Sequence, residues 1–500
     1  MIRLPIPLYG WITALGVLSA NLLAAQEASP PSLITEKITV YALDGDGPPN
    51  LVSNGLPMKP GALRDLANIR ILDGQTEVPL ATQALAYWPH DHSIRSVLIQ
   101  FEAGFRGKTK TYTLQLGRSR TTSDRPLVPV TWALPTRLFS LSADYLSESL
   151  ITWEQKPLGK TGFPAWDKKQ LENFSSVNRR ISSSVTCPNA DLYYDSISTQ
   201  YQLYARTGDP RYLVNARRWA LHYRRDQIWL SGPNIGHTRC GDVNGTRYVY
   251  VQALVYDYFF FGDAEARRVA GLIVDNFLMQ HGDSYYYVAP NTRRAWTERE
   301  PAYALMGILA YYEATGNAAY LREVQRRVGL LHRMQVENGR RAWVHNLHDH
   351  DPNEGCQTTD WGSSPWMSGL LLEAVVQYHK LTRDPMAVDS ITMALDDLMT
   401  HYLATKDHAG RSFIYLGCSR YTEGTPDLDN LIAHAYGYGY AITGKPEYRK
   451  VGMDLFNTSV RSGWSGDFRH YNQQFRSSGY FVAYVSSGYE VPGVAVDWGE

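Results

Sequence analysis

The spacing of apolar residues changes once along the chain, near residue 188. Before that point, from residue 32 to about 130, apolar and polar residues alternate in short runs such as LITEKITVYAL, SVLIQFEA and KTYTLQL. Alternation of this kind, cut by turn sequences such as DGDGPP and FRGK, is typical of strands with one buried face. The pattern predicts a β domain over 32–130, of the sandwich or barrel-like kind. Residues 131–188 are poorly patterned and rich in proline, so we expect an irregular connector there, with one helix near 140–152.

After Pro188 the apolar positions recur with the period of a helix, and one unit repeats along the rest of the chain. Each unit is a helix, a tight turn and a second helix, as in STQYQLYARTGDPRYLVNARRWALHYRR. Glycine at such a turn ends the first helix in a left-handed conformation, and proline suits the start of the second. The turns lie at Gly208-Asp209-Pro210, Gly262-Asp263, Gly316-Asn317, Arg383-Asp384-Pro385 and Gly444-Lys445-Pro446.

Each repeat pairs one nearly all-apolar helix with one that carries more charge. Five clear pairs and a partial sixth predict an α+β multidomain protein, in which an (α/α)6 toroid over 189–490 follows the N-terminal β-sandwich or barrel-like domain. An open solenoid of the tetratricopeptide kind fits less well, because its period is only about 34 residues. We expect the apolar helices to line the inside of the ring (250–261, 302–312 and 368–378) and the arginine-rich helices the outside (212–225, 264–276 and 321–334).

Composition and the N-terminus narrow the class of protein. Lys+Arg and Asp+Glu both number 49, so bulk charge gives no attraction to a nucleic acid, and we expect no nucleic-acid partner. The 34 Tyr, 13 Trp and 14 Phe suit either a surface that grips sugars or a tyrosine-rich helical core. Residues 1–25 combine one positive charge, an apolar run and small residues, which is typical of a cleaved secretory signal peptide. Because the run is shorter than the roughly 20 apolar residues of a membrane span, we expect a periplasmic or secreted protein with no integral membrane segment after cleavage.

Four cysteines fit an oxidising compartment and allow three pairings. None belongs to a Cys-x-x-Cys motif, so neither a zinc ribbon nor a thioredoxin-like centre is indicated. Each precedes an apolar helix at the end of the ring opposite the tight turns, where a disulfide would brace a rim. We expect Cys187–Cys240 and Cys356–Cys418, and four unpaired thiols are the alternative.

The candidate chemistry lies in the long connections between repeats, because long ordered loops in a compact domain are usually functional. All of them lie at the end of the ring opposite the tight turns. In the first of these connections, 226–246, Asn234, His237 and Arg239 could place a proton-transfer group beside an anion clamp, or could simply form turns. The connections are the segments 226–246, 281–298, 336–364 and 403–427.

The second loop ends in Trp296, Glu298 and Arg299. We expect Glu298 and Arg299 to face the cavity or to pair with each other. Trp296 is either a sugar platform or part of the core of the rim. At the end of the third loop, the start of an apolar helix carries residues suited to ring stacking and to a carboxylate role: Asp360, Trp361 and Trp366.

The third loop also contains a run of histidines, His345, His348 and His350. Imidazoles beside carboxylates could ligate a metal, but the spacing lacks the helical register of HExxH. The sequence therefore predicts neither a metal site nor a cofactor.

The fourth loop and the helix after it complete the set of candidates. Tyr421 and Glu423 lie in the loop. On the helix, His434 and Tyr438 are four residues apart and share a face. They form either a pair in the cavity or a buried structural pair.

The N-terminal stretch NGLPMKPGALRD, followed by QALAYWPHDHSIR, resembles the first, β-barrel-like domain of exo-rhamnogalacturonan lyases. The resemblance implies a strand–turn–strand unit and, with the helical half, the architecture of polysaccharide lyases and some glycoside hydrolases. The sequence departs from the family pattern at His90-Asp91-His92, where Asp-Gly is usual. No catalytic residue is carried over, because the matched positions build the turn: Gly55, Pro57, Gly61, Gln83, Trp88, Pro89, Ser93 and Arg95.

The leading hypothesis is an exported lyase that cleaves a uronic-acid polysaccharide or oligosaccharide by β-elimination. That chemistry needs a group that neutralises the C5 carboxylate, a base that takes the adjacent proton and an acid for the leaving oxygen. The rim offers Arg239, Arg299 or Asn234 for neutralisation, His237 or His434 as the base, Tyr421 or Tyr438 as the acid, and Trp296, Trp361 and Trp366 for stacking.

Two other classes of function remain open. A glycoside hydrolase on the same ring needs two carboxylates, for which Glu298, Asp360 and Glu423 are available. A non-catalytic glycan-binding or envelope-assembly protein is the third hypothesis. The density of histidine, tyrosine and arginine on the rim favours the lyase.

Overall fold

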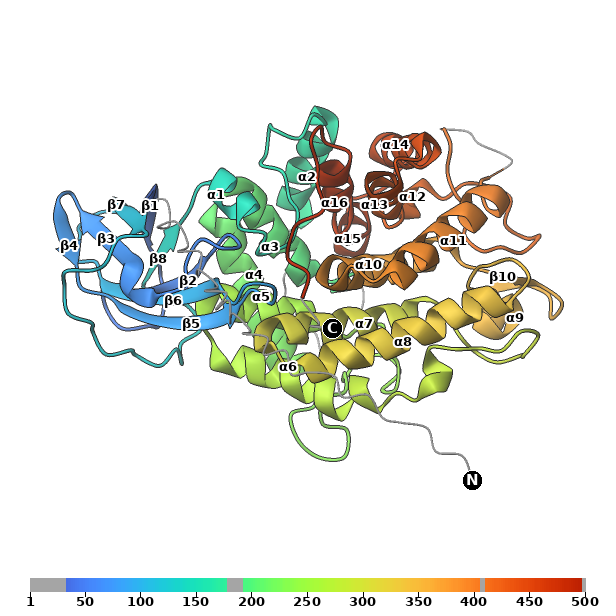
Figure 1. Ribbon diagram of the computed structural model, residues 1–500, viewed down its shortest axis with the longest axis horizontal. Coiled ribbons are helices and arrows are strands. Elements are labelled where there is room, and N and C mark those ends of the chain that lie inside the picture. Colours follow the sequence, from blue (N-terminus) through green and yellow to red (C-terminus); the bar gives the residue numbers. More distant parts are fainter. Residues whose placement is uncertain (1–32, 178–191, 405–409, 497–500) are drawn as a thin grey trace, which may run out of the picture.

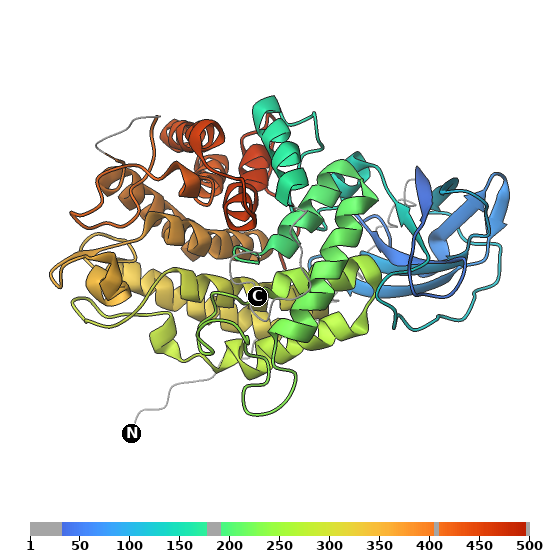
Figure 2. The same ribbon diagram turned by 180° about the vertical axis from the view of Figure 1, so that it is seen from behind.

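The computed structural model describes residues 33–177, 192–404 and 410–496. The predicted signal peptide, residues 1–25, and Cys187 lie outside the described residues. A β domain lies at one end of a larger helical domain (Figure 1, Figure 2).

The strands form one curled eight-stranded sheet, in the order β4-β3-β7-β1-β8-β2-β6-β5. Described neighbours are antiparallel apart from β2 and β8, which meet in parallel at Val52 and Arg137. Alternate residues of β1, such as Ile38 and Val40, are buried, as the alternating pattern predicts. The bounds are β1 (Ile34–Ala42), β2 (Leu51–Pro57), β3 (Ile69–Asp73), β4 (Thr76–Val78), β5 (Ala81–Tyr87), β6 (Ile94–Glu102), β7 (Thr109–Leu116) and β8 (Arg137–Ser140).

The stretch 131–188, expected to be an irregular connector, contains regular elements in its described part. It contributes β8 to the sheet and then forms α1 (Ala143–Glu148) and α2 (Pro164–Val177). Pro164 is the first residue of α2, where proline costs no hydrogen bond. Trp166 on α2 donates a hydrogen bond to Ser478 Oγ (3.0 Å), so α2 packs on the helical domain.

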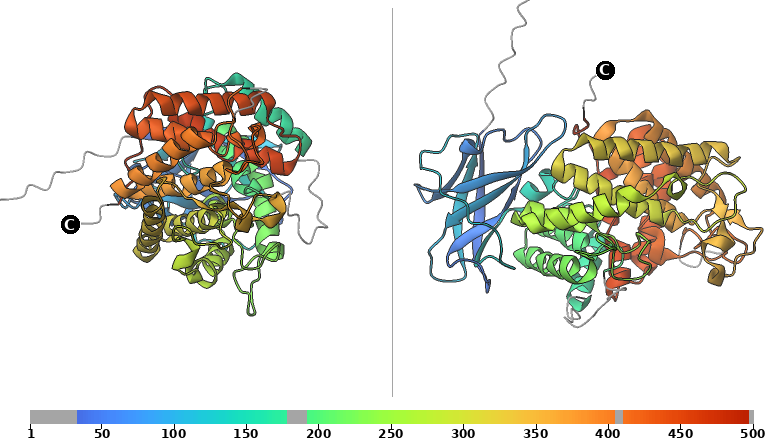
Figure 3. Two further views of the ribbon diagram at one scale, coloured as in Figure 1. Left: turned by 90° about the vertical axis from the view of Figure 1, so that its right-hand side faces the viewer. Right: turned by 90° about the horizontal axis from the view of Figure 1, so that it is seen from below.

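The helical domain is a ring of helix pairs, and Figure 3 shows the helices surrounding its centre. Consecutive inner helices pack side by side, and the ring closes where Gln202 Nε2 donates to Tyr480 Oη (2.9 Å). The inner helices are α3 (Ser196–Thr207), α5 (Val251–Phe261), α7 (Arg299–Thr315), α10 (Pro365–Thr382), α13 (Ala433–Thr443) and α16 (Ser478–Tyr484). The outer helices are α4 (Pro210–His222), α6 (Ala264–Asn276), α8 (Ala318–Glu337), α11 (Pro385–His401) and α14 (Pro446–Ser462), with α2 beside α14.

Burial separates the two sets of helices as expected. Every residue of α5 is buried, whereas α6 buries one face and exposes the other. Short elements line the end of the ring where the long connections lie: β9 (His345–Asn346), α9 (Leu347–His350), β10 (Trp361–Gly362), α12 (Pro426–Asp429) and α15 (Phe468–Phe475).

The tight turns lie at the other end of the ring, and the turn at Gly262 packs against the β domain. Gly262 ends α5 with φ +66°, and Leu98 of β6 packs directly on it. Ser96 Oγ donates to Phe259 O (2.7 Å), and Tyr258 Oη donates to Leu85 O (3.0 Å). The β domain therefore covers the tight-turn end and leaves the opposite end for the long connections.

The stretch 88–95, which begins with Trp88 and ends with Arg95, joins the two domains. Arg95 is fully buried, stacks on Trp88 (4.4 Å from the ring centre) and forms an ion pair with Glu313 of α7 (2.6 Å). Trp153 Nε1 donates to the same carboxylate (3.1 Å). These residues fix the sheet on the ring.

Candidate functional site

A cluster of aromatic and charged side chains lies at the end of the ring opposite the β domain. Its floor consists of Tyr193, Tyr194 and Trp366. Tyr193 and Tyr194 stack with ring centres 3.9 Å apart, and Tyr194 meets Trp366 edge-on at 6.0 Å. All three are buried. Tyr193 and Trp366 stand at or just before the start of an inner helix, so the fold of the ring brings them together.

Three arginines converge on Tyr193. Arg299 Nη1 donates to Tyr193 Oη (3.0 Å), and its guanidinium lies 5.7 Å from the ring centre of Trp366. Arg247 lies over the ring of Tyr193 (4.6 Å), and Arg469 approaches the same ring at 5.6 Å. Arg247 and Arg299 are half-buried and Arg469 is exposed, so positive charge is concentrated over an aromatic floor.

The starts of the inner helices add to this positive potential. The first turns of α3, α5, α7 and α10 lie at this end of the ring, and the N-terminus of a helix carries a partial positive charge. The chain as a whole is neutral. The site is therefore locally suited to an anion although the bulk composition is not.

One wall of the site pairs tyrosines with a carboxylate. Tyr415 packs on Trp366 (6.0 Å between ring centres) and donates a hydrogen bond to Glu354 Oε1 (3.0 Å). Tyr421 packs on Tyr415 and donates to Glu354 O (3.1 Å). Burial raises the pKa of Glu354, with Tyr415 acting against it. Next to this wall, a hollow of about 550 Å³ is lined by Tyr415 and residues 420–425.

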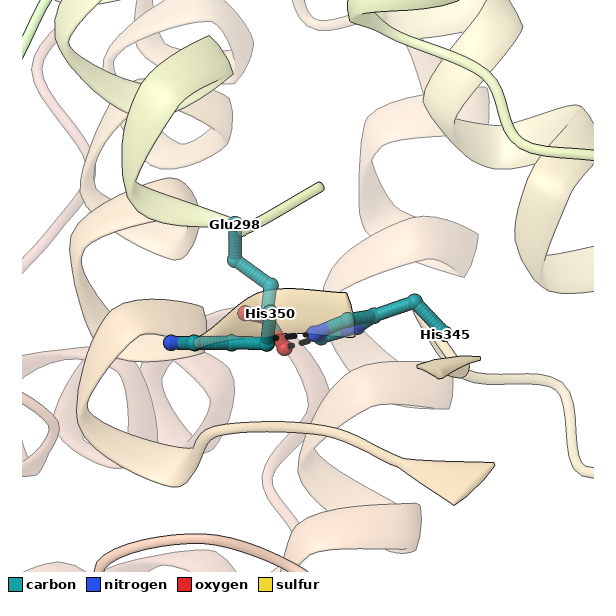
Figure 4. Close-up of side chains that lie close together, drawn as sticks. All are labelled: Glu298, His345 and His350. Carbon is teal, nitrogen blue, oxygen red and sulfur yellow. Dashed lines mark hydrogen bonds and ion pairs between the residues drawn. The ribbon is translucent and has the colours of Figure 1, made fainter. Parts of the chain in front are cut away.

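A second wall consists of Glu298, His345 and His350 (Figure 4). Glu298 Oε1 accepts hydrogen bonds from Ser364 N (2.9 Å) and Ser368 Oγ (3.3 Å). His345 Nδ1 lies 3.8 Å from that oxygen, and His345 Nε2 lies 3.2 Å from His350 Nδ1.

Burial sets the charge state of this second wall. It raises the pKa of Glu298 to about 8 and lowers the pKa of His345 to about 4. Burial, with His345 and Arg299 nearby, lowers the pKa of His350 to about 2. Without a ligand, the carboxyl is therefore protonated at neutral pH and both imidazoles are uncharged. Such a group could hold a metal, because uncharged imidazole is the form that ligates one.

Beneath the floor, an ion pair supports the site. Arg476 pairs with Glu373 of α10 (2.9 Å) and donates to the carbonyl of Tyr194 (3.3 Å). His434 is fully buried on α13, where its Nε2 lies 3.1 Å from Gly369 O. The predicted base His434 thus lies in the packed interior of the ring.

Tyr438, the other member of the predicted pair on α13, is also fully buried. Its hydroxyl lies 2.7 Å from His379 Nδ1, in the C-terminal half of α10, on the side of the ring that faces the tight turns. Both residues are therefore buried, as the structural alternative expects, but they bond to different partners, His434 to Gly369 O and Tyr438 to His379.

The first long loop folds against the outside of the ring. Gly236 packs on Leu272 of α6, and His237 stacks on Phe277 (4.1 Å) with its Nδ1 2.8 Å from Val243 O. Arg239 lies over Trp229 (4.5 Å). Asn234 is exposed in the same loop.

The remaining candidates are divided between the site and the packing of the rim. Trp296 is buried, donates from Nε1 to Tyr285 O (3.0 Å) and meets His345 edge-on, so it belongs to the core of the rim. Asp360 accepts from Gln357 N (2.7 Å), and Trp361 lies on β10, which pairs with β9. Glu423 is exposed and lines the hollow beside Tyr421.

The disulfide Cys356–Cys418 is confirmed, with Cα atoms 5.9 Å apart. It ties the third long loop to the fourth, next to Glu354 and Tyr421. A carboxylate oxygen of Asp360 lies within 4.8 Å of both sulfurs, but disulfide sulfurs are not thiolate ligands, so this group cannot hold a metal in the oxidised protein. The predicted partner pair, Cys187–Cys240, lies outside the described residues because Cys187 does.

The sequence-based selection missed several residues of the cluster: Tyr193, Tyr194, Arg247, Glu354, Tyr415 and Arg469. A signal for the first three was present. Each precedes an inner helix by a few residues, as Glu298 and Trp361 do, so extending the same rule to every inner helix would have found them. Glu354 and Tyr415 lie within the long loops, where no local pattern separates them from their neighbours.

In the part of the chain that the structure describes, none of the helices has the length and apolarity needed to span a membrane.

Comparisons with known proteins give similarity of structure only. No protein-family model matches the chain, and no curated protein matches its sequence. Among solved structures, the chain is similar to a D-mannose isomerase (12% identity, TM-score 0.48, covering 65% of this chain and 98% of that one). It is also similar to a glycosyl hydrolase of family 88 from Bacteroides vulgatus (12%, TM-score 0.46, covering 64% and 99%). A polysaccharide lyase matches over 87% of this chain and 64% of its own (11%, TM-score 0.38).

Proposed function

We propose that this protein is an exported carbohydrate-active enzyme, a lyase that cleaves a uronic-acid glycan by β-elimination on an (α/α)6 toroid. The observation that carries the proposal is the pair of half-buried arginines, Arg247 and Arg299, over the aromatic floor. β-Elimination begins by neutralising the carboxylate at C5, which makes the adjacent proton acidic. An arginine presents a planar fork that binds a carboxylate through two parallel hydrogen bonds.

The proton transfers are assigned to the tyrosine wall. Tyr415 can protonate the leaving oxygen, because its hydroxyl faces Glu354 and can recover a proton from that carboxyl. Tyr193 is the candidate base, since its hydroxyl already contacts Arg299, the residue that would hold the substrate carboxylate. These roles replace those that the sequence suggested for His237, His434 and Tyr438.

The flat faces of the wall suit a sugar ring. Tyr415 and Tyr421 are half-buried, pack on each other and border the hollow of about 550 Å³. Aromatic rings bury the apolar face of a sugar while leaving its hydroxyls free to bond. These faces support an oligosaccharide or polysaccharide as the proposed substrate class.

The N-terminal resemblance and the expected signal peptide fit the same proposal. A first domain that resembles the one in exo-rhamnogalacturonan lyases would suit an enzyme that acts on a uronic-acid glycan. Residues 1–25 would direct the protein to the periplasm or the medium.

A glycoside hydrolase is the second candidate, and one observation favours it. Burial raises the pKa of Glu298 to about 8, as a general acid at neutral pH requires. Its partner would be Glu354, since Asp360 is engaged by Gln357 N and Glu423 is exposed. The arginines of the site, however, suit an anionic substrate better.

The test incubates the purified mature protein with uronic-acid and neutral glycans and follows the ultraviolet absorbance of the unsaturated uronate that only elimination forms. We expect a rise with a uronate polymer. Arg299→Gln should lower kcat about 100-fold or more, because the variant loses a hydrogen-bond donor to the negative charge that develops in the transition state. The matched control is Arg333→Gln, because Arg333 lies exposed on α8 and pairs only with Glu337 among its described acidic neighbours. New reducing ends without absorbance would contradict elimination and favour the hydrolase.

A further inference from the structure

We propose that Glu298, His345 and His350 bind a divalent transition metal ion of the zinc type, through one carboxylate oxygen and two imidazole nitrogens. This set of donors differs from the arginine cluster that carries the proposed function, and binding can be measured without any substrate. The inference therefore stands independently of the lyase assignment.

The spacing of the donors fits such an ion. His345 Nε2 and His350 Nδ1 are 3.2 Å apart, and one ligand atom from each of the three residues lies within 4.8 Å of the others. Two nitrogens bonded tetrahedrally to zinc at about 2.0–2.1 Å lie roughly 3.3 Å from each other. The two imidazoles are already at that separation, so only the carboxylate has to close on the ion.

Each of two donors is oriented by a contact through its other polar atom. His345 Nδ1 lies 3.3 Å from Trp343 O, so Nδ1–H can donate to that carbonyl, and Nε2, which faces His350 Nδ1 at 3.2 Å, is left to ligate. Glu298 Oε1 is fixed by Ser364 N and Ser368 Oγ, which leaves Oε2. Metal-ligating histidines and carboxylates are usually held in this way by outer hydrogen bonds.

Glu298 Oε2 supplies the second, independent observation. The residue is fully buried, and this oxygen has no hydrogen-bond partner among the described residues. A buried carboxyl oxygen without a partner costs free energy whether or not the group carries a proton, and a bound ion would account for it. In Figure 4 the carboxyl group of Glu298 lies beside the two imidazoles, with Oε1 3.8 Å from His345 Nδ1.

The local fold is rigid enough to hold the donors in place. His345 lies on β9, which pairs with β10, and Trp296 packs edge-on against its ring. Asn346 caps α9 by accepting from Asp349 N (3.1 Å), which fixes the turn that carries His350. Glu298 is the residue immediately before α7.

The chemistry of the donors selects the class of ion. Two imidazoles and one carboxylate suit zinc and its neighbours better than magnesium or calcium, which prefer oxygen ligands. Three protein ligands leave a fourth position open. The ion would lie beside Arg299, the next residue after Glu298, and would add a second positive charge to that side of the site.

The test measures zinc binding by the full-length mature protein, without a histidine tag, after treatment with a chelator. Titration calorimetry and elemental analysis should both give one zinc ion per chain. His350→Gln should weaken binding at least about 100-fold. The control is His348→Gln, on the same short helix, because His348 Nδ1 lies against Cys356 O and outside the three-residue group. It should bind as the wild type does.

A second variant keeps the test decisive if His350→Gln fails to fold. Ser368→Ala removes only the hydroxyl that orients Glu298 and should weaken zinc binding about 10-fold or more while the protein stays folded. Cobalt(II) in place of zinc should give the intense visible absorption of a tetrahedral site. This absorption should be absent from His350→Gln. The proposal is overturned if the wild type binds no zinc, or if His350→Gln and His348→Gln bind it equally.

Discussion

His379 and Tyr438 form a buried hydrogen bond between the neighbouring inner helices α10 and α13. The hydroxyl of Tyr438 lies 2.7 Å from His379 Nδ1, and both side chains are buried. A neutral imidazole satisfies the hydroxyl without bringing a charge into the interior of the ring. The pair therefore stabilises the packing of α10 against α13. Protonation of His379 should change the free energy of unfolding.

The uncharged state of His379 should make the protein less stable as the pH falls. Burial lowers its pKa to about 4, whereas histidine in an unfolded chain titrates near 6.5. Between these values the unfolded chain binds a proton that the folded chain does not, so the free energy of unfolding falls as the pH drops through 6.5. In urea unfolding followed by circular dichroism, His379→Gln should lose about 2 kcal/mol less than the wild type between pH 7 and pH 5.

Tyr438→Phe is the control for this measurement. It removes the hydrogen bond but leaves the imidazole buried, so it should lower stability at both pH values and keep the wild-type slope. Parallel slopes for the wild type and His379→Gln would show that His379 does not titrate as its burial implies.

At the scale of elements, the tight turns do more than reverse the chain. Gly262 and Gly316 both end inner helices in the left-handed region, with φ +66° and +65°. Their surroundings differ: a Cβ on Gly262 would lie 2.8 Å from Leu98 of β6, whereas a Cβ on Gly316 would meet nothing within 4 Å. The two glycines therefore separate the cost of backbone conformation from the cost of contact with the β domain.

Alanine at each turn should measure these two costs. Gly316→Ala should lower the free energy of unfolding by about 1–2 kcal/mol, the cost of a left-handed alanine. Gly262→Ala should cost a further 1–3 kcal/mol or so, because the added methyl overpacks Leu98. Guanidinium unfolding of the two variants would give the difference. If both variants lost the same free energy of unfolding, Leu98 would move away from the added methyl at Gly262 without a measurable cost.

How far the sequence predicts a helix or strand depends on the number of residues over which the spacing of apolar positions is regular. Inner helices such as α5 and α10 are long and buried throughout, and the residues that cap the outer helices α6 and α8, Asp263 and Asn317, accept from the backbone as their type suggests. β8 has only four residues and α2 lies in a proline-rich stretch, so neither gives a periodic signal. Short elements like these are specified by tertiary contacts more than by local pattern.

The site was predictable to the extent that topology determines it. Glu298, Arg299 and Trp366 were found because they stand at the starts of inner helices, and the ring brings those starts together. The loop with His237 and Arg239 connects two repeats at the same end of the ring as the site. It nevertheless packs on the outside of α6. No feature of a single sequence states on which side of a rim a long loop will fold.

At the scale of the whole molecule, the β domain closes the end of the ring that the site does not use. The contact is made by buried charge as well as by apolar packing. Arg95 of β6 meets Glu313 of α7 at 2.6 Å, and Lys380 of α10 meets Glu154 at 2.7 Å. Trp153 lies between the two pairs, donating to Glu313 and facing Lys380 (4.3 Å). Each charge therefore has a partner from another segment of the chain.

Because each of these charges is buried, removing one partner should be far more damaging than removing both. Arg95→Met leaves Glu313 buried without its cation and should cost about 3–5 kcal/mol of unfolding free energy. Glu313→Gln strands Arg95 in the same way. Burial already raises the pKa of Glu313, so in Arg95→Met the carboxyl should take up a proton, and the loss should grow as the pH rises.

A double-mutant cycle tests this coupling between the domains. Arg95→Met with Glu313→Gln should be less destabilised than the sum of the single variants, by roughly 1–3 kcal/mol. The exposed pair Arg333 and Glu337 on α8 provides the matched cycle and should couple by only about 0.3–0.5 kcal/mol. If the two cycles gave the same coupling energy, the ion pair would not hold the β domain on the ring, and apolar contacts such as that of Leu98 with Gly262 would have to do so alone.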